Sequence, residues 1–144
     1  MKIALHGLVL KAQYLPDLAH LFGELAKHQI EILVTEQLDR ALRLVGAKSH
    51  GYWVIENQTE LNSIDFLISI GGDGTLLDAV CLIGNREIPM LGLNTGRLGF
   101  LATVATDRIS EAVENLASGN YQIVSRALIL SLIHISEPTR QAEI

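Results

Sequence analysis

Residues 70–77, IGGDGTLL, place three glycines around one carboxylate at the end of an apolar stretch. The preceding residues 65–70, DFLISI, are almost wholly apolar, as in a strand that is covered on both faces. A strand that enters a helix through a glycine-rich turn exposes several backbone N–H groups together, so the turn can bind a phosphate without any lysine. Glycines also let a ligand approach the chain closely.

Asp73 is the unusual member of this turn, because a carboxylate repels phosphate. It fits there if it binds a metal, accepts a hydrogen bond from a sugar hydroxyl or takes the proton from one, and all three are roles in phosphoryl transfer to an alcohol. The alternative is a tight turn in which Asp73 caps the helix that follows. The spacing matches neither a Walker loop nor a G-x-G-x-x-G fingerprint.

A second glycine-rich turn follows the next expected strand. Residues 91–101, LGLNTGRLGFL, surround Asn94, Arg97 and Phe100 with three glycines. Turns that follow successive parallel strands lie at the same edge of a sheet, where open α/β folds bind their ligands. The two turns are therefore predicted to line one crevice.

The remaining pattern predicts the elements that position these turns. Apolar residues at three- and four-residue steps predict helices, and short apolar or β-branched runs predict strands. Strands are expected at residues 3–5, 30–34, 65–70, 88–94 and 121–133, and helices at 15–26, 36–46, 75–83 and 106–119. Residues 48–62 are interpreted mostly as loop, although YWVIE can form a strand. This alternation is typical of parallel α/β winding, and residues 1–130 are expected to form one domain.

The composition excludes several functions. The 144 residues carry a net charge of −5 with scattered basic residues, so we expect no nucleic acid or membrane partner. No apolar run is long enough to span a membrane, and the N-terminus does not resemble a signal peptide. The five histidines lack the spacing of a metal site. The single cysteine, Cys81, is expected in the core and fits a reducing compartment, so a cytoplasmic protein is expected.

The segments GGDGTLL and LGLNTGRLGFLA, in which Asp73 and Asn94 are 21 residues apart, together resemble the two N-terminal signatures of the NAD kinase family. The resemblance covers about residues 1–130. It implies a Rossmann-like open, mostly parallel sheet with helices on both faces, and phosphorylation of the adenosine 2′-hydroxyl of NAD. The pattern at Asn94–Leu101 is the restricted part, because GGDG alone also occurs in lipid kinases and phosphofructokinases.

The resemblance implies roles for the matching residues of the first turn. Asp73 would accept the proton of the ribose 2′-hydroxyl, and Asp73 and Gly74 would contact NAD. Gly71, Gly72 and Gly74 would face the phosphates of the donor, and Thr75 would belong to the same nucleotide-binding set.

Three residues of the second turn have two interpretations each. Phe100 would pack against the adenine, as a flat apolar ring can, or would be a core residue between sheet and helix. Asn94 would bind the nucleotide or stabilise its turn through its side chain. Arg97 would contact the ligand or pair with a surface carboxylate.

The resemblance also implies cofactors and partners. The donor would be ATP or polyphosphate, Mg²⁺ would arrive with the nucleotide, and the full-length protein would be a homo-oligomer. The resemblance further implies a second, mostly β domain that begins near the end of this chain. That domain is expected to be missing here, so the fragment alone is expected to be inactive. The final residues, HISEPTRQAEI, break the apolar pattern, and residues 131–144 are expected to be a non-native or disordered tail. A lipid or sugar kinase and a non-catalytic nucleotide-binding module are the alternatives.

Overall fold

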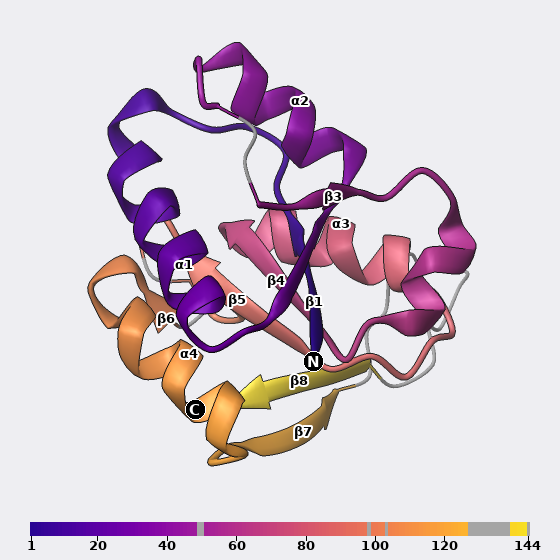
Figure 1. Ribbon diagram of the computed structural model, residues 1–144. Coiled ribbons are helices and arrows are strands. Elements are labelled where there is room, and N and C mark those ends of the chain that lie inside the picture. The colour runs from indigo at the N-terminus through magenta and orange to yellow at the C-terminus, as the bar shows by residue number, and fades with distance from the viewer. Residues whose placement is uncertain (49–50, 98, 103, 127–138, 144) are drawn as a thin grey trace.

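The computed structural model describes residues 1–48, 51–97, 99–102, 104–126 and 139–143, in which strands and helices alternate (Figure 1). The strands are β1 (Lys2–His6), β2 (Glu31–Val34), β3 (Trp53–Val54), β4 (Phe66–Gly71), β5 (Met90–Asn94), β6 (Val104–Ala105), β7 (Gln122–Arg126) and β8 (Thr139–Glu143). The α-helices are α1 (Leu15–Lys27), α2 (Glu36–Leu44), α3 (Asp73–Ile83) and α4 (Ile109–Ser118). Short 3₁₀ turns cover Ala12–Tyr14 (η1), Gln58–Ser63 (η2) and Thr106–Arg108 (η3).

The strands form one sheet in the order β3-β2-β1-β4-β5-β8-β7, and β6 also pairs with β5. Every pairing is parallel except that of β7 with β8. The chain winds from β1 through β2 to β3 on one side and from β4 to β5 on the other, so its direction reverses between β1 and β4. At such a switch point the loops at the carboxyl ends of the strands diverge and leave a crevice.

Alternate residues of each central strand face opposite sides of the sheet and build two cores. Ile3, Ile68 and Leu93 belong to one core, which they share with the buried faces of α1, α2 and α4. Ala4 and Leu67 belong to the other, which lies under α3 and η2. Figure 1 shows α1 and α4 side by side on one face and α3 on the opposite face. The predicted open, mostly parallel sheet with helices on both faces is therefore confirmed.

Local sequence signals explain where the helices begin and end. Pro16 lies in the first turn of α1, where the missing N–H leaves no bond unmade. The Thr35 hydroxyl accepts a hydrogen bond from the Leu38 N–H (3.3 Å) and caps α2. Gly119 ends α4 with φ 78°, which confirms the predicted stop. In the described part of the chain, no helix is both long and apolar enough to cross a membrane.

The structure differs from the sequence-based expectations at several places. Cys81, which was expected in the core, is exposed, because it faces outward from α3 while its helical neighbours Ala79 and Val80 are buried. The region expected to be mostly loop contains β3 and η2. Of the strand expected at residues 121–133, β7 covers the first part and residues 127–133 lie outside the described residues. Within the expected tail, residues 139–143 form β8. That the tail is non-native stays a prediction.

His6 connects three elements from a fully buried position at the end of β1. Its Nδ1 lies 2.9 Å from the Thr35 hydroxyl, and its Nε2 lies 2.8 Å from a carboxylate oxygen of Asp78 on α3. Because Thr35 already accepts the Leu38 N–H, its hydroxyl proton is available to His6, which suits a neutral ring that donates to Asp78. Burial lowers the pKa of His6, although the hydrogen bond to Asp78 opposes that shift.

Candidate nucleotide site at the switch point

The two glycine-rich turns lie side by side at the carboxyl edge of the sheet, as predicted. Strands β4 and β5 are parallel neighbours, and their register sets Gly71 opposite Asn94. The Thr95 N–H donates to the Gly71 carbonyl over 3.1 Å and continues this pairing past the strand ends. The first turn therefore leads directly into α3 beside the second turn.

A cavity of about 340 Å³ opens between three loops at this edge. The two turns contribute Gly71, Gly72 and Thr75 on one side and the segment 94–97 on the other. The loop after β1 supplies the third wall. The lining residues are Val9, Lys11, Tyr14, Gly71, Gly72, Thr75, Asn94, Thr95, Gly96 and Arg97. Four of the predicted site residues thus share one cavity, whereas Asp73, Gly74 and Phe100 are not among its lining residues.

Asp73 spans the two turns through its carboxylate. Oδ1 accepts hydrogen bonds from the N–H groups of Leu101 and Ala102 (both 3.0 Å), and Oδ2 accepts one from Phe100 (2.9 Å). These bonds, that from Ala102 most of all, lower the pKa of Asp73, while partial desolvation opposes the shift. The alternative role as a helix cap is wrong, because Gly72 occupies the N-cap of α3 and no side chain caps it.

The glycines of the second turn allow this contact. A Cβ added to Gly99 would overlap the Asp73 carboxylate, at 2.5 Å from Cγ and 2.6 Å from Oδ2. A Cβ on Gly92 would lie 2.6 Å from the Cα of Ala102. The backbone at Ala102 can therefore pass this close to β5 only because residue 92 has no side chain. Both positions set the amides of residues 100–102 around Asp73.

Asn94 holds the second turn in shape. Its side chain is buried, its Nδ2 donates to the carbonyls of Arg97 (2.7 Å) and Ala102 (3.2 Å), and its Oδ1 accepts the Gly96 N–H (2.7 Å). Both amide protons are used within the protein. The turn-stabilising interpretation of Asn94 is therefore confirmed, and direct contact with a ligand stays a prediction.

Phe100 and Arg97 project outward from the same turn. Phe100 is 93% exposed, so the interpretation as a core residue is wrong and its ring is accessible to a partner. Arg97 is exposed, and among the described residues it takes part in no ion pair, which leaves the expected pairing with a surface carboxylate without support.

The loop after β1 was missed by the sequence reasoning. Val9, Lys11 and Tyr14 line the cavity, yet they carry no glycine-rich signature. The only available signal is topological, because the first strand of a doubly wound sheet delivers its following loop to the switch point. That inference requires the strand order, which the pattern of elements does not provide.

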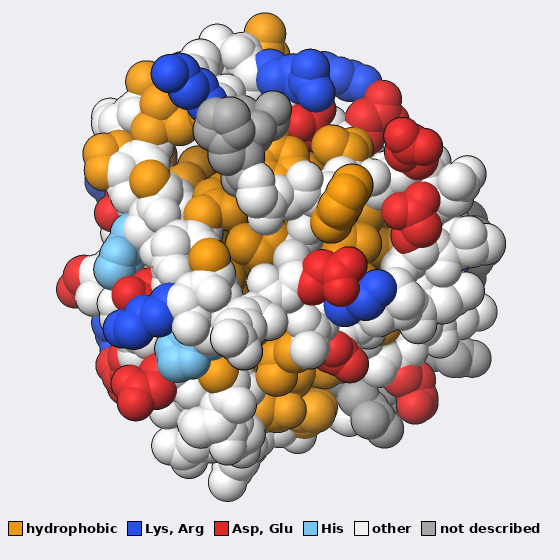
Figure 2. Space-filling model, viewed as in Figure 1, with side chains coloured by type: hydrophobic (Ala, Val, Ile, Leu, Met, Phe, Trp, Pro, Cys, Tyr) orange, Lys and Arg blue, Asp and Glu red, His pale blue; other side chains and the backbone are white. Residues whose placement is uncertain are grey.

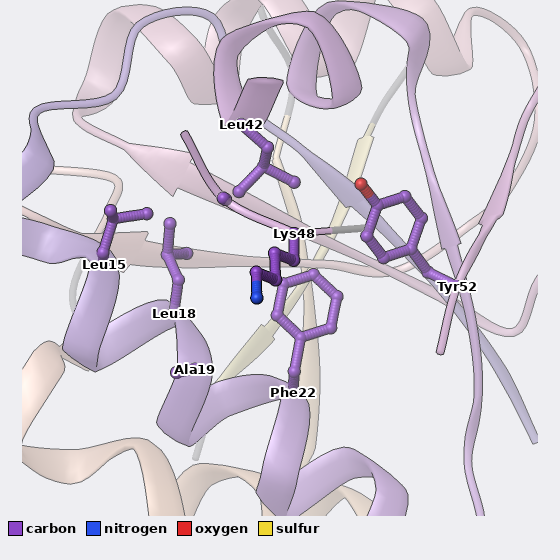
Figure 3. Close-up of a pocket in the computed structure, with 8 residues that line it drawn as sticks. Leu15, Leu18, Ala19, Phe22, Leu42, Lys48 and Tyr52 are labelled. Atoms are coloured by element: carbon purple, nitrogen blue, oxygen red, sulfur yellow. The ribbon is translucent and has the colours of Figure 1, made fainter. Parts of the chain in front are cut away.

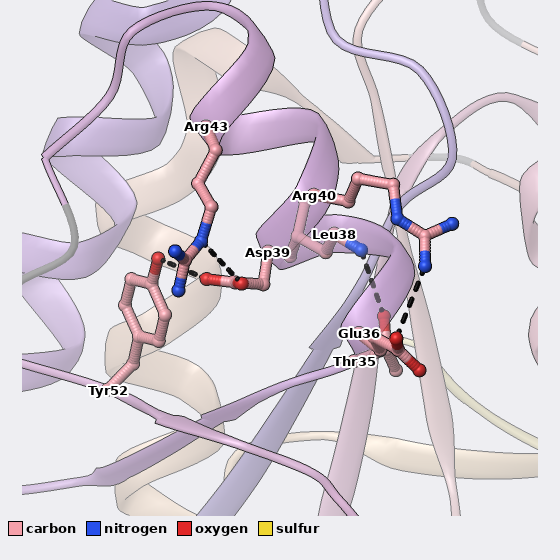
Figure 4. A network of polar contacts seen from close by, with 7 residues as sticks. All are labelled: Thr35, Glu36, Leu38, Asp39, Arg40, Arg43 and Tyr52. Carbon is pink, nitrogen blue, oxygen red and sulfur yellow. Dashed lines mark hydrogen bonds and ion pairs between the residues drawn. The ribbon is translucent and has the colours of Figure 1, made fainter.

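A second cavity, of about 360 Å³, lies between α1, α2 and the segment before β3 (Figure 3). Its walls are mainly apolar, and hydrophobic side chains gather in this region of the surface (Figure 2). The wall residue Tyr52 donates to the Asp39 carboxylate (3.0 Å), which also pairs with Arg43 (2.8 Å; Figure 4). Burial and this hydrogen bond raise the pKa of Tyr52 to about 12. These contacts tie α2 to β3 and bring no reactive groups together.

A protein-only metal site does not occur in the described ranges, because no three His, Cys, Asp or Glu side chains gather there as metal ligands would. The arrangement at the switch point can instead hold an anion. Backbone amides and two basic residues border the cavity, and one ionised carboxylate lies beside it.

Comparison with known proteins finds relatives of this chain. The sequence profile of the ATP-NAD kinase N-terminal domain matches residues 18–121. An NAD kinase of Cytophaga hutchinsonii is 39% identical over 130 residues, which are 90% of this chain and 44% of that protein. An NAD kinase of Bacteroides fragilis is 38% identical over 132 residues, with the same coverage. The chain thus spans less than half the length of these relatives.

Two solved structures share the fold. Yeast NADH kinase in complex with NADH superimposes with a TM-score of 0.74 at 18% identity, over 97% of this chain and 46% of that one. An NAD kinase from Archaeoglobus fulgidus in complex with ATP gives a TM-score of 0.57 at 20% identity, over 89% and 42%. The profile match and the sequence identity to the bacterial enzymes go further than the fold: this chain belongs to the NAD kinase family.

Proposed function

We propose that the chain is the N-terminal part of an NAD kinase, which transfers a phosphoryl group from ATP or polyphosphate to the adenosine 2′-hydroxyl of NAD. The observation that carries this proposal is the Asp73 carboxylate, which joins the GGDG turn to the amides of residues 100–102 beside the cavity. The NADH and ATP complexes of the two structural neighbours support a nucleotide ligand.

Asp73 is proposed to receive the ribose hydroxyl. A carboxylate offers about four lone-pair sites, of which three are occupied, so Oδ2 retains one for a substrate hydroxyl. The lowered pKa of Asp73 keeps the group ionised and makes it a weak proton acceptor. Phosphoryl transfer through a loose transition state depends mainly on positioning and charge, so Asp73 would orient the hydroxyl and take its proton late.

The other residues are proposed to hold the nucleotides. Gly71 and Gly72 border the cavity with open space above Gly72, where a Cβ would meet no atom within 4 Å, so phosphates can approach the backbone there. Gly74 and Thr75 would extend this surface along the first turn of α3. Phe100 would stack on the adenine, because its ring is almost fully exposed. Asn94 would act by holding its turn.

Mg²⁺ would arrive with the donor and neutralise charge on its phosphates. The full-length protein is further proposed to be cytoplasmic and to form a homo-oligomer. Light scattering of the purified protein tests the assembly, and a monomeric mass would contradict the proposed homo-oligomer.

The test of function uses the full-length gene product. We expect it to convert NAD to NADP with ATP or polyphosphate, and we expect Asp73→Asn to lower turnover by about 10²- to 10⁴-fold. Asp107→Asn is the matched control, because Asp107 is an exposed aspartate in η3, outside the lining of the cavity. Phosphorylation of a lipid or a sugar in place of NAD would identify the rival kinase. Full turnover by Asp73→Asn would remove the assigned role of this residue.

The 144-residue chain itself provides a second comparison. We expect it to bind ATP without producing NADP, because relatives of the family are more than twice as long. NADP formation by this chain alone would contradict the expectation that the fragment is inactive.

A further inference from the structure

We propose that Lys11 and Arg97 form a cationic clamp that holds a condensed phosphate chain in the cavity at the switch point. The proposal rests on the proposed kinase function and deepens it, since it adds the loop after β1 to the donor site. Lys11 lies outside both glycine signatures, whereas Arg97 lies within the second one, where its role has so far been left open.

The order of the strands sets the two cations on opposite sides of the glycine turn. In the sheet, β4 lies between β1 and β5. Lys11 follows β1 and Arg97 follows β5, and both line the cavity together with Gly71 and Gly72, which follow β4. An anion that lies over the amides of the central turn is therefore flanked by one positive charge from each neighbouring loop.

In the part of the chain that the structure describes, no acidic side chain offsets the charge of either cation. Neither Lys11 nor Arg97 forms an ion pair within the described ranges. No acidic residue is among the described residues that line the cavity. The nearby carboxylate of Asp73 is directed to the amides of residues 100–102 instead. The two like charges repel one another across the cavity, so an anion between them gains attraction from both and relieves that repulsion.

The size of the cavity favours a chain of phosphates over a single one. Its 340 Å³ corresponds to roughly ten waters at about 30 Å³ each, and a triphosphate carries ten oxygens. Tyr14, which also lines the cavity, adds a phenolic hydroxyl that can donate to a phosphate oxygen. An arginine can bind two oxygens at once, whereas a lysine acts as a point charge, so the two cations suit different positions along the chain.

The shared chemistry of the ligand is a triphosphate, which either ATP or free polyphosphate supplies. The experiment titrates sodium tripolyphosphate, ATP and orthophosphate into the 144-residue chain by calorimetry at low salt. We expect tripolyphosphate to bind at least tenfold more tightly than orthophosphate. ATP that binds more tightly than tripolyphosphate would identify the nucleotide as the source, and equal affinities would identify free polyphosphate.

Three variants test the clamp. Lys11→Gln and Arg97→Gln are each expected to weaken tripolyphosphate binding by about tenfold, as loss of one charge-assisted contact in a solvent-exposed site would do. Lys27→Gln is the matched control, because Lys27 is an exposed lysine in the last turn of α1 that does not line the cavity. Equal affinities for all three variants, or no binding by the unaltered chain, would overturn the proposal. Thermal unfolding of each variant verifies that the fold is retained.

The full-length enzyme separates this proposal from the proposed function. We expect Lys11→Gln to raise the KM for the phosphoryl donor and to leave the KM for NAD unchanged. If NAD is phosphorylated and the donor KM does not respond to Lys11→Gln or Arg97→Gln, the clamp is wrong and the kinase function stands. If tripolyphosphate binding follows both cations and NAD is not phosphorylated, the clamp stands and the function is wrong.

Discussion

Replacement of Asp73 by asparagine tests how the two glycine-rich turns are held together. In the native protein, three N–H groups donate to this carboxylate over 2.9–3.0 Å. The amide oxygen of asparagine can occupy the position of Oδ1 and keep the bonds from Leu101 and Ala102. Its NH₂ group would then face the Phe100 N–H, so that two donors oppose each other.

The magnitude follows from these three contacts. The two retained bonds lose their charge assistance, which removes about half of their strength, or about 0.5 kcal/mol each. The lost bond to Phe100 contributes about 1 kcal/mol, reduced because this N–H lies at the surface and can bond to water. Asp73→Asn is therefore expected to lower the free energy of unfolding by about 1–2 kcal/mol at pH 7.

The pH dependence provides an independent check. Because the pKa of Asp73 in the folded state lies below its ordinary value of 3.8, the contribution of the carboxylate is present above pH 3.8. It is lost as the pH falls through the lowered pKa, where the folded protein also takes up the proton. The difference in stability between the native chain and Asp73→Asn should therefore shrink under acidic conditions.

The assay is urea denaturation of the 144-residue chain, followed by circular dichroism between pH 7 and pH 3. Asp107→Asn serves as the control and is expected to change the free energy of unfolding by less than about 0.5 kcal/mol. Equal midpoints for the two variants at pH 7 would refute the assignment of Asp73 as the link between the turns. A difference that does not depend on pH would refute its electrostatic origin.

Four further substitutions, one of them a control, address the glycines and the buried histidine. Gly72→Val should leave the free energy of unfolding within about 1 kcal/mol of the native value, because its Cβ would point into open space. The same substitution should abolish tripolyphosphate binding in calorimetry, and retained binding would contradict the assignment of Gly72 to the phosphate-binding surface. Gly99→Ala should lower the free energy of unfolding by about 1–3 kcal/mol, because its Cβ would overlap the Asp73 carboxylate. The control Gly23→Ala, within α1, should raise the free energy of unfolding by about 0.5–1 kcal/mol. If the urea midpoints of both variants shift in the same direction, the overlap at Gly99 is disproved. Burial lowers the pKa of His6 below 6.5, so the unfolded state binds more protons and the free energy of unfolding should decrease as the pH falls through 6.5. His6→Gln should reduce the change in urea midpoint between pH 7.5 and pH 5.5. If the midpoint of this variant depends on pH as strongly as that of the native chain, His6 is excluded as the source.

The layered α/β architecture and the glycine-rich turn around Asp73 could be predicted from the order of the residues. Apolar strands that alternate with amphipathic helices can bury their surfaces only as a sheet covered on both faces, and this pattern is local enough to be recognised along the chain. The glycines around Asp73 could also be recognised as a phosphate-binding turn, because such a turn requires exposed backbone amides at the start of a helix. Cys81 was misplaced because an apolar neighbourhood in sequence does not specify which side of a helix faces the core.

The contacts made by the side chains of the site depend on long-range folding, so they could not be predicted from the sequence. Asp73 meets amides 27–29 residues away, and its low pKa arises from those distant donors, which local composition cannot reveal. Phe100 is of a residue type that is usually buried, yet it is exposed to solvent. The reason is that the turn that carries it is folded around the side chain of Asn94. Lys11 joins the cavity only because β1 and β4 are adjacent in the sheet, and strand order is set by long-range packing that no short segment encodes.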